Sequence, residues 1–428
     1  KYLENCNDRR KNISSIKESI NSSPEYNNKL KSVFDSADRK SHKLSEQMAN
    51  ELFFHKDLNM SATRVNDFYS CPFSYYCKYG LHLRKPYKVE INSLSTGNLV
   101  HSCFEKMMST QVEGKKVYNE DFTKLSDKII RSTIHEEFNK YIESEMGGDF
   151  GKNATFRENM KRLEQSTFHA VKNIQTEFEN CLFVPEAFEF NLTKENGESI
   201  LKLDVAEDIH INIRGSIDRA DVFTDENGQR YIRIVDYKTG GTEFRLEDLY
   251  NGLNLQMLIY LLAVTQRINE LNEDGKLKPS GILYSHIKYV DAKMTPVEIE
   301  ELKENGILKE KVFIKRAERY KPDGMIVENE FTLEAMNKHF GYVFTPFKTS
   351  KSGSLGNNKD VYVTEQYFLG LEQFALRKIY ELADKLKTGE IPADPISTKK
   401  GLKCTYCDYW GICGNYNPKN PRMTNKKA

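Results

Sequence analysis

Four cysteines placed at opposite ends of the chain restrict the folds that this sequence can adopt. Three of them form the compact run Cys404-Thr-Tyr-Cys407-Asp-Tyr-Trp-Gly-Ile-Cys413, and the fourth, Cys71, lies far upstream before a proline. Closely spaced thiolates are typical metal ligands, so we expect the four side chains to bind one metal centre. Such a centre would join the two ends of the fold.

The residues alone leave the identity of this metal open. A zinc site usually contains a second close pair of ligands, whereas here one cysteine follows the C-x2-C pair. One distant thiolate with a compact run also suits a four-thiolate iron–sulfur cluster. Cys77 competes with Cys71, but six residues along a helix correspond to a rotation of ~600°, so the two side chains would diverge. The other four of the eight cysteines are expected to be ordinary thiols: Cys6, Cys77, Cys103 and Cys181.

Composition describes a globular protein without an evident membrane segment. The 428 residues are 39% hydrophobic and 29% charged, and the longest apolar stretch is far too short to cross a bilayer. The first residue is not Met and no signal peptide precedes the fold, so we expect a piece of a longer cytoplasmic protein with no membrane contact. With 63 basic and 62 acidic residues, the overall charge does not by itself indicate nucleic-acid binding.

The order of the predicted elements indicates an α/β protein. Residues 1–60 are polar and are expected to connect this fragment to a preceding part, and residues 61–428 to form one domain with a core at about 188–300. A closing helix and the cysteine run occupy 365–415. The expected elements are a Ser61-capped helix at 61–69, helices at 96–108, 246–268 and 365–387, strands at 188–192, 209–213, 231–235 and 281–287, a hairpin turn at 226–228, a helical region at 120–180 and a flexible loop at 349–359.

Two carboxylates and a lysine in the predicted core have the arrangement of a magnesium nuclease. Asp236 ends a β-branched strand and Lys238 follows two residues later, so both side chains lie on one face. Asp218, on the adjacent strand, is the natural second ligand. A hard dication bound by carboxylates activates water and offsets the charge of the scissile phosphate. Asp221 is expected to have a structural role instead, paired with Arg219 or another basic residue.

Three further polar residues fit such a site less specifically. Gln256 and Tyr260 are four residues apart and share a helix face, from which an amide could orient water and a hydroxyl could reach a DNA phosphate. Taken alone, such a pair more often belongs to a helix that packs its polar tips at the surface. His101 tolerates Mn²⁺ better than Mg²⁺, although a lone histidine is often structural.

Taken together, the motifs resemble those of the RecB-like branch of the PD-(D/E)XK nucleases. They occur in the family's order as Gly97-Asn-Leu-Val-His101, Gly215-Ser-Ile-Asp218-Arg, Val235-Asp236-Tyr-Lys238 and Gln256-Met-Leu-Ile-Tyr260. The resemblance implies a restriction-endonuclease-like core sheet flanked by helices, with helical insertions. It implies Mg²⁺ (or Mn²⁺) ligands at His101, Asp218, Asp236 and the carbonyl of Tyr237. It implies catalytic roles for Asp218, Asp236, Lys238, Gln256 and Tyr260.

The two cysteine segments are in addition similar to the nuclease domain of the AddB family, which belongs to bacterial helicase–deoxyribonucleases, over about residues 61–413. This resemblance implies a [4Fe–4S] cluster bound by Cys71, Cys404, Cys407 and Cys413, which joins the ends of the domain around the DNA path. It further implies a helicase–nuclease partner protein, AddA. The implied function is Mg²⁺-dependent exonuclease cleavage of the 5′-terminated strand during double-strand-break repair. The chain has no Walker A motif and therefore no motor of its own.

Two alternatives remain at this point. The protein could be a structural iron–sulfur clamp on DNA with an idle acidic site, or a CRISPR-associated RecB-like exonuclease, which also uses four cysteines. All expected ligands and Lys238 are present, which favours an active enzyme, and CRISPR-associated chains are much shorter. Because the net charge is near zero, DNA binding would depend on a local basic track, for which we expect Lys399, Lys400 and Lys403.

Overall fold

The structure of the chain, a computed structural model, describes residues 43–54, 57–84, 93–145, 153–193, 197–206, 209–239, 244–271, 277–287, 295–304, 321–338, 344–347, 359–413 and 421–423. Most of the expected connector and nearly all of the expected loop at 349–359 therefore lie outside the described residues. No helix in these ranges is long and apolar enough to cross a membrane.

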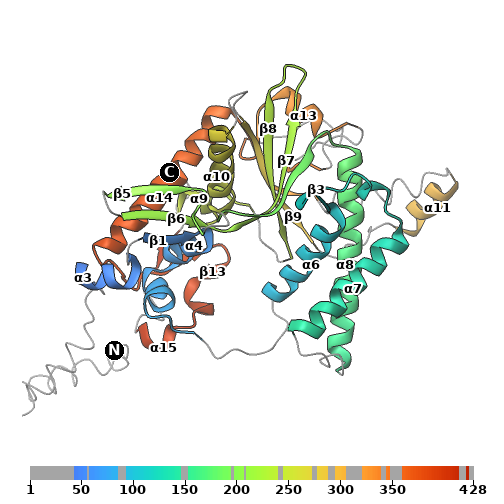
Figure 1. Cartoon of the computed structure of the whole chain (residues 1–428). Coiled ribbons are helices and arrows are strands. Elements are labelled where there is room, and N and C mark those ends of the chain that lie inside the picture. Colours follow the sequence, from blue (N-terminus) through green and yellow to red (C-terminus); the bar gives the residue numbers. More distant parts are fainter. Residues whose placement is uncertain are drawn as a thin grey trace, which may run out of the picture.

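A six-stranded mixed sheet forms the centre of the fold (Figure 1). In sheet order its strands are β11 (Tyr362–Val363), β10 (Asp323–Val327), β9 (Lys278–His286), β8 (Arg230–Lys238), β7 (Ser216–Thr224) and β4 (Val184–Asn191). β8 pairs antiparallel with β7 and parallel with β9. The sheet thus extends beyond residue 300, the expected end of the core.

Helices cover both faces of this sheet and bury two apolar cores (Figure 1). One core contains Val235 and Tyr237 of β8. It is covered by α6 (Ser93–Met108), α7 (Asp127–Glu145) and α8 (Ala154–Glu179). The other contains Ile232 and Ile234. It is covered by α10 (Gln256–Leu271) and α14 (Glu365–Lys387). Successive side chains of a strand point to opposite faces, so β8 contributes to both cores. The predicted α/β class is confirmed.

Local signals placed several helices correctly. Ser61 caps α4 (Ala62–Ser70), where its hydroxyl accepts a hydrogen bond from the backbone N–H of Arg64 at 3.3 Å. α14 has the predicted bounds, and its N-cap Thr364 accepts from the N–H of Tyr367. The hairpin turn at 226–228 joins β7 to β8.

The single long helix predicted at 246–268 was wrong. The chain forms α9 (Leu246–Tyr250) and then α10, separated by a turn. Gly252 and Asn254 in this turn have φ of +77° and +55°, which a right-handed helix does not allow. A side chain at Gly252 would also overlap the ring of Tyr69, so this glycine permits close packing against α4.

A second, three-stranded sheet packs beside the first and begins before Ser61. β1 (Asp57–Ser61) pairs parallel with β6 (Ile209–Arg214), which pairs antiparallel with β5 (Lys202–Ala206). Leu58 and Met60 are fully buried in the same core as α10 and α14. The described part of the expected connector therefore contributes to the fold, and the strand expected at 209–213 lies outside the central sheet.

Candidate active site

Asp236 and Lys238 lie at the end of β8, on the face covered by α10. Lys238 Nζ is 2.6 Å from Asp236 Oδ2, and Asp236 is only 4% exposed. Gln256, at the start of α10, donates from Nε2 to Asp236 Oδ1 at 3.1 Å. The two-residue period of the strand thus places the carboxylate of Asp236 beside the ammonium of Lys238. The start of α10 brings the amide of Gln256 to the same carboxylate.

Asp218 reaches the same place from the neighbouring strand β7. Its Oδ2 accepts a hydrogen bond of 2.7 Å from the backbone N–H of Tyr237, the residue between Asp236 and Lys238. His101 approaches from α6, with Nε2 3.0 Å from the carbonyl oxygen of Tyr237 and Nδ1 3.5 Å from Asp218 Oδ1. Side chains from β7 and α6 therefore contact the backbone N–H and carbonyl of Tyr237 on β8.

Tyr260 lies one turn after Gln256 and completes this group. The residue is 6% exposed, and its hydroxyl occupies the space that a side chain at position 215 would need, so Gly215 is required for this approach. Burial, followed by the charges of Asp236 and Asp218, raises the pKa of Tyr260 to about 12. The structure therefore brings every residue of the predicted nuclease site into one region.

Glu189 is a member of this region that the sequence analysis missed. Its Oε1 lies 3.4 Å from His101 Nδ1, and His101, Glu189 and Asp218 offer ligand atoms within 4.8 Å of one another. Glu189 has φ of +44°, and the adjacent Phe188 and Phe190 contact cores on opposite faces of the sheet. Simple alternation along this strand could not predict where its carboxylate would point.

Burial and the close approach of several carboxylates shift the pKa values of this site. Burial, together with the charge of Asp236, raises the pKa of Asp218 to about 7. Burial also raises the pKa of Asp236, against the opposing effect of Lys238. For His101, burial lowers the pKa, but the hydrogen bond to Glu189 and the charge of Asp218 outweigh it and raise the pKa to about 9. A divalent cation would offset this concentration of negative charge, and its preferred oxygen donors are present.

Asp221 lies on the opposite face of the sheet and takes no part in this site. It is fully buried, with Oδ1 2.8 Å from Arg219 Nε and Oδ2 2.9 Å from Arg233 Nε. The expected structural pairing of Asp221 with Arg219 is confirmed.

The four predicted cysteine ligands meet at a second location. Cys71 is an extended residue between α4 and the short α5 (Pro72–Tyr75). It lines a small cavity of about 10 Å³ together with Cys404, Cys407 and Cys413. A backbone hydrogen bond of 3.1 Å from Phe73 to the carbonyl of Pro392 joins the two segments nearby. Among the described residues, no carboxylate or imidazole lines this cavity, and the four thiols are its strongest potential metal-binding groups.

The single helix that was expected to turn Cys77 away from Cys71 does not form. Cys71 is not part of a continuous helix with Cys77, because the chain is extended at Cys71 and Tyr76–Gly80 forms a π-helical turn. Cys77 is fully buried and packs in the same apolar cluster as Cys71 and Cys413, but it does not line the cavity.

Comparison with protein families matches residues 59–414 to the PD-(D/E)XK nuclease superfamily. The chain belongs to this superfamily. The expected enzyme class, a metal-dependent nuclease, is thereby confirmed, and so is the predicted fold class.

Curated relatives of this nuclease are named as the B components of ATP-dependent helicase/deoxyribonucleases, the AddB proteins. Similar proteins occur in Clostridium tetani (27% identity over 83% of this chain), Staphylococcus haemolyticus (25% over 88%) and Clostridioides difficile (25% over 87%). The nuclease chain spans about a third of the length of these relatives, between 30% and 32%. The resemblance to the AddB family is confirmed.

Proposed function

We propose that this nuclease hydrolyses phosphodiester bonds of DNA with Mg²⁺ and serves as the nuclease domain of an AddB-type helicase–nuclease protein. The observation that carries the proposal is the convergence of Asp218, Asp236 and His101 around the backbone of Tyr237, with Lys238 beside them. This donor set suits a hard dication, and Mn²⁺ would be accepted as well because imidazole binds it readily.

In this proposal each residue has a defined role. The metal would be bound by His101, Asp218, Asp236 and the carbonyl of Tyr237. A bound Mg²⁺ would lower the pKa of water and stabilise charge on the phosphate and leaving oxygen. Lys238 offsets negative charge next to Asp236, and Gln256 keeps that carboxylate in place through its hydrogen bond. Tyr260 would donate a hydrogen bond from its hydroxyl to the DNA backbone.

We further propose that the four cysteines bind a [4Fe–4S] cluster that joins the ends of the domain. Support comes from the cavity lined by Cys71, Cys404, Cys407 and Cys413, to which both segments contribute. Burial raises the pKa of the Cys71 thiol, and it raises the pKa of Cys404 to about 11, so metal binding would release protons. Four thiolates also suit zinc, and iron analysis with the visible absorption spectrum distinguishes the two metals.

The proposed partners follow from the relatives. Their names describe one component of a helicase and deoxyribonuclease, which supports a DNA strand as substrate and an AddA-type partner that unwinds it. We propose that the nuclease then cuts the 5′-terminated strand during repair of double-strand breaks in the bacterial cytoplasm. The same names favour this function over a CRISPR-associated exonuclease.

The test is cleavage of linear DNA by the purified chain with Mg²⁺. We expect Asp218→Asn to reduce the rate by about 10² or more, because it removes a charged group from a preorganised site. Asp204→Asn is the matched control, since Asp204 lies on β5 with an 83% exposed side chain. Equal rates for wild type and Asp218→Asn would refute the active-site assignment. Tight DNA binding without Mg²⁺-dependent cleavage by the wild type would instead support a structural clamp.

A further inference from the structure

Tyr237 is bound at three points, two of which belong to the candidate active site. Its backbone N–H donates to Asp218 at 2.7 Å, and its carbonyl oxygen lies 3.0 Å from His101 Nε2. The third point is its side chain, which lies on the opposite face of the sheet. There the hydroxyl oxygen accepts a hydrogen bond of 2.8 Å from Arg219 Nη1.

Arg219 belongs to a buried network of charged residues behind the site. Its guanidinium is fully buried and also contacts Asp221 at 2.8 Å and Glu177 at 3.0 Å. Arg233, only 1% exposed, contacts the same two carboxylates at 2.9 and 2.6 Å. Two guanidinium groups and two carboxylates thus neutralise one another away from water.

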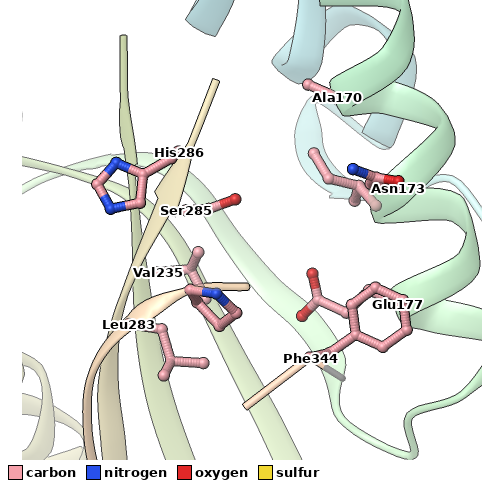
Figure 2. Close-up of a pocket in the computed structure, with 10 residues that line it drawn as sticks. Ala170, Asn173, Glu177, Val235, Leu283, Ser285, His286 and Phe344 are labelled. Atoms are coloured by element: carbon pink, nitrogen blue, oxygen red, sulfur yellow. The ribbon is translucent and has the colours of Figure 1, made fainter. Parts of the chain in front are cut away.

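The network joins three elements of the fold. Arg219 and Asp221 lie on β7, Arg233 lies on β8, and Glu177 comes from α8. Figure 2 shows Glu177 extending from its helix toward the sheet, where Val235 of β8 is labelled. Glu177 also lines a small cavity of about 30 Å³ between α8 and the sheet.

A network of this kind fixes the positions of its side chains more than it stabilises the fold. Removing two ion pairs from water is costly, so a buried network is weak evidence for a gain in stability. Its bonds are directional, however, and the planar guanidinium of Arg219 fixes the direction of the Tyr237 hydroxyl. Through the tyrosine ring, this constraint restricts the position of the Tyr237 backbone, whose N–H and carbonyl contact Asp218 and His101.

We propose that Arg219 and the side chain of Tyr237 are positioning residues for the metal site. They fix the β8 backbone so that the Tyr237 carbonyl and the carboxylate of Asp218 are preorganised for a cation, although neither side chain touches it. The proposal rests on the proposed function, because it requires a cation at this site. Groups that orient metal ligands from behind typically change metal affinity by about 10- to 100-fold when mutated.

The test compares two tyrosine substitutions on one strand. Tyr237→Phe removes the hydroxyl that Arg219 binds and keeps the ring, so the fold is retained. Tyr231→Phe is the matched control, because Tyr231 is also on β8 and is similarly buried (6% against 4% exposed). Its hydroxyl donates a hydrogen bond to Asp225 at 3.3 Å and accepts one from Asn329 at 3.5 Å, and the variant loses both. Mn²⁺ binding is measured by electron paramagnetic resonance titration, and denaturant unfolding reports the stability of both variants.

We expect Tyr237→Phe to weaken Mn²⁺ binding about 10-fold or more and Tyr231→Phe to change it less than about 2-fold. DNA cleavage by Tyr237→Phe should require more Mg²⁺ but approach the wild-type rate at saturation. Wild-type Mn²⁺ affinity in Tyr237→Phe would overturn the positioning role, and so would an equal loss in Tyr231→Phe. Absence of Mn²⁺ binding by the wild type would overturn the proposed function itself, and the positioning role with it.

Discussion

The buried Glu372 should make the free energy of unfolding of this protein depend on pH. This residue lies on α14 with 5% of its surface exposed, and its Oε1 has no hydrogen-bond partner among the described residues. Burial raises its pKa from 4.5 to about 7. The folded state therefore binds a proton more tightly than the unfolded state, and the carboxyl group remains neutral at mildly acidic pH.

The sign and size of the effect follow from this difference. The protonated acid contributes to the free energy of unfolding; this contribution is fully present below pH 4.5 and is lost as the pH rises through about 7. At 1.36 kcal/mol per pH unit, the loss reaches about 3 kcal/mol. Glu372→Gln cannot ionise, so relative to wild type it should gain up to about 3 kcal/mol in unfolding free energy between pH 5 and pH 8.5.

The assay is urea unfolding of wild type and variant at several pH values from 5 to 8.5. Glu136→Gln on α7 serves as the control, because Glu136 is an exposed residue within a helix. We expect the free-energy difference between Glu372→Gln and wild type to grow with pH, and that of the control to stay constant. A constant difference for Glu372→Gln would refute the reasoning, since the buried acid would then ionise as it does in the unfolded chain.

The remaining predictions concern the two candidate centres and the DNA path. Asp236→Ala and Lys238→Ala should each lower Mg²⁺-dependent cleavage by about 10² or more with an unchanged circular dichroism spectrum; near wild-type cleavage at saturating Mg²⁺ would mean that the site lies elsewhere. Cys71→Ala should lose iron and visible absorbance and become protease-sensitive near the C-terminus, whereas Cys77→Ala should keep its iron; an iron-replete Cys71→Ala protein would contradict the ligand choice. The basic track is tested by combined alanine substitution of Lys399, Lys400 and Lys403. This change should weaken single-strand binding and flatten its salt dependence with iron content unchanged, and an unaltered salt slope would place the strand on another surface.

Much of the site could be predicted because its signals are local. Asp236 and Lys238 share a face through the two-residue period of a strand, and Gln256 and Tyr260 share one through the helical period. The cap at Ser61 and the bounds of α14 likewise depend on neighbouring residues only. Backbone geometry makes these relations independent of the remaining fold.

Tertiary structure decided what depends on contacts between distant segments. Glu189 enters the active site because a positive φ interrupts the alternation of β4, which no periodic pattern indicates. In the turn that separates α9 from α10, Gly252 packs against the ring of Tyr69, which lies far away in the sequence. Arg219 on β7 reaches the hydroxyl of Tyr237 on the neighbouring strand β8, on the face opposite the metal ligands. Burial of charged groups depends on which elements pack together, and that information resides in the assembled core rather than in any single stretch of sequence.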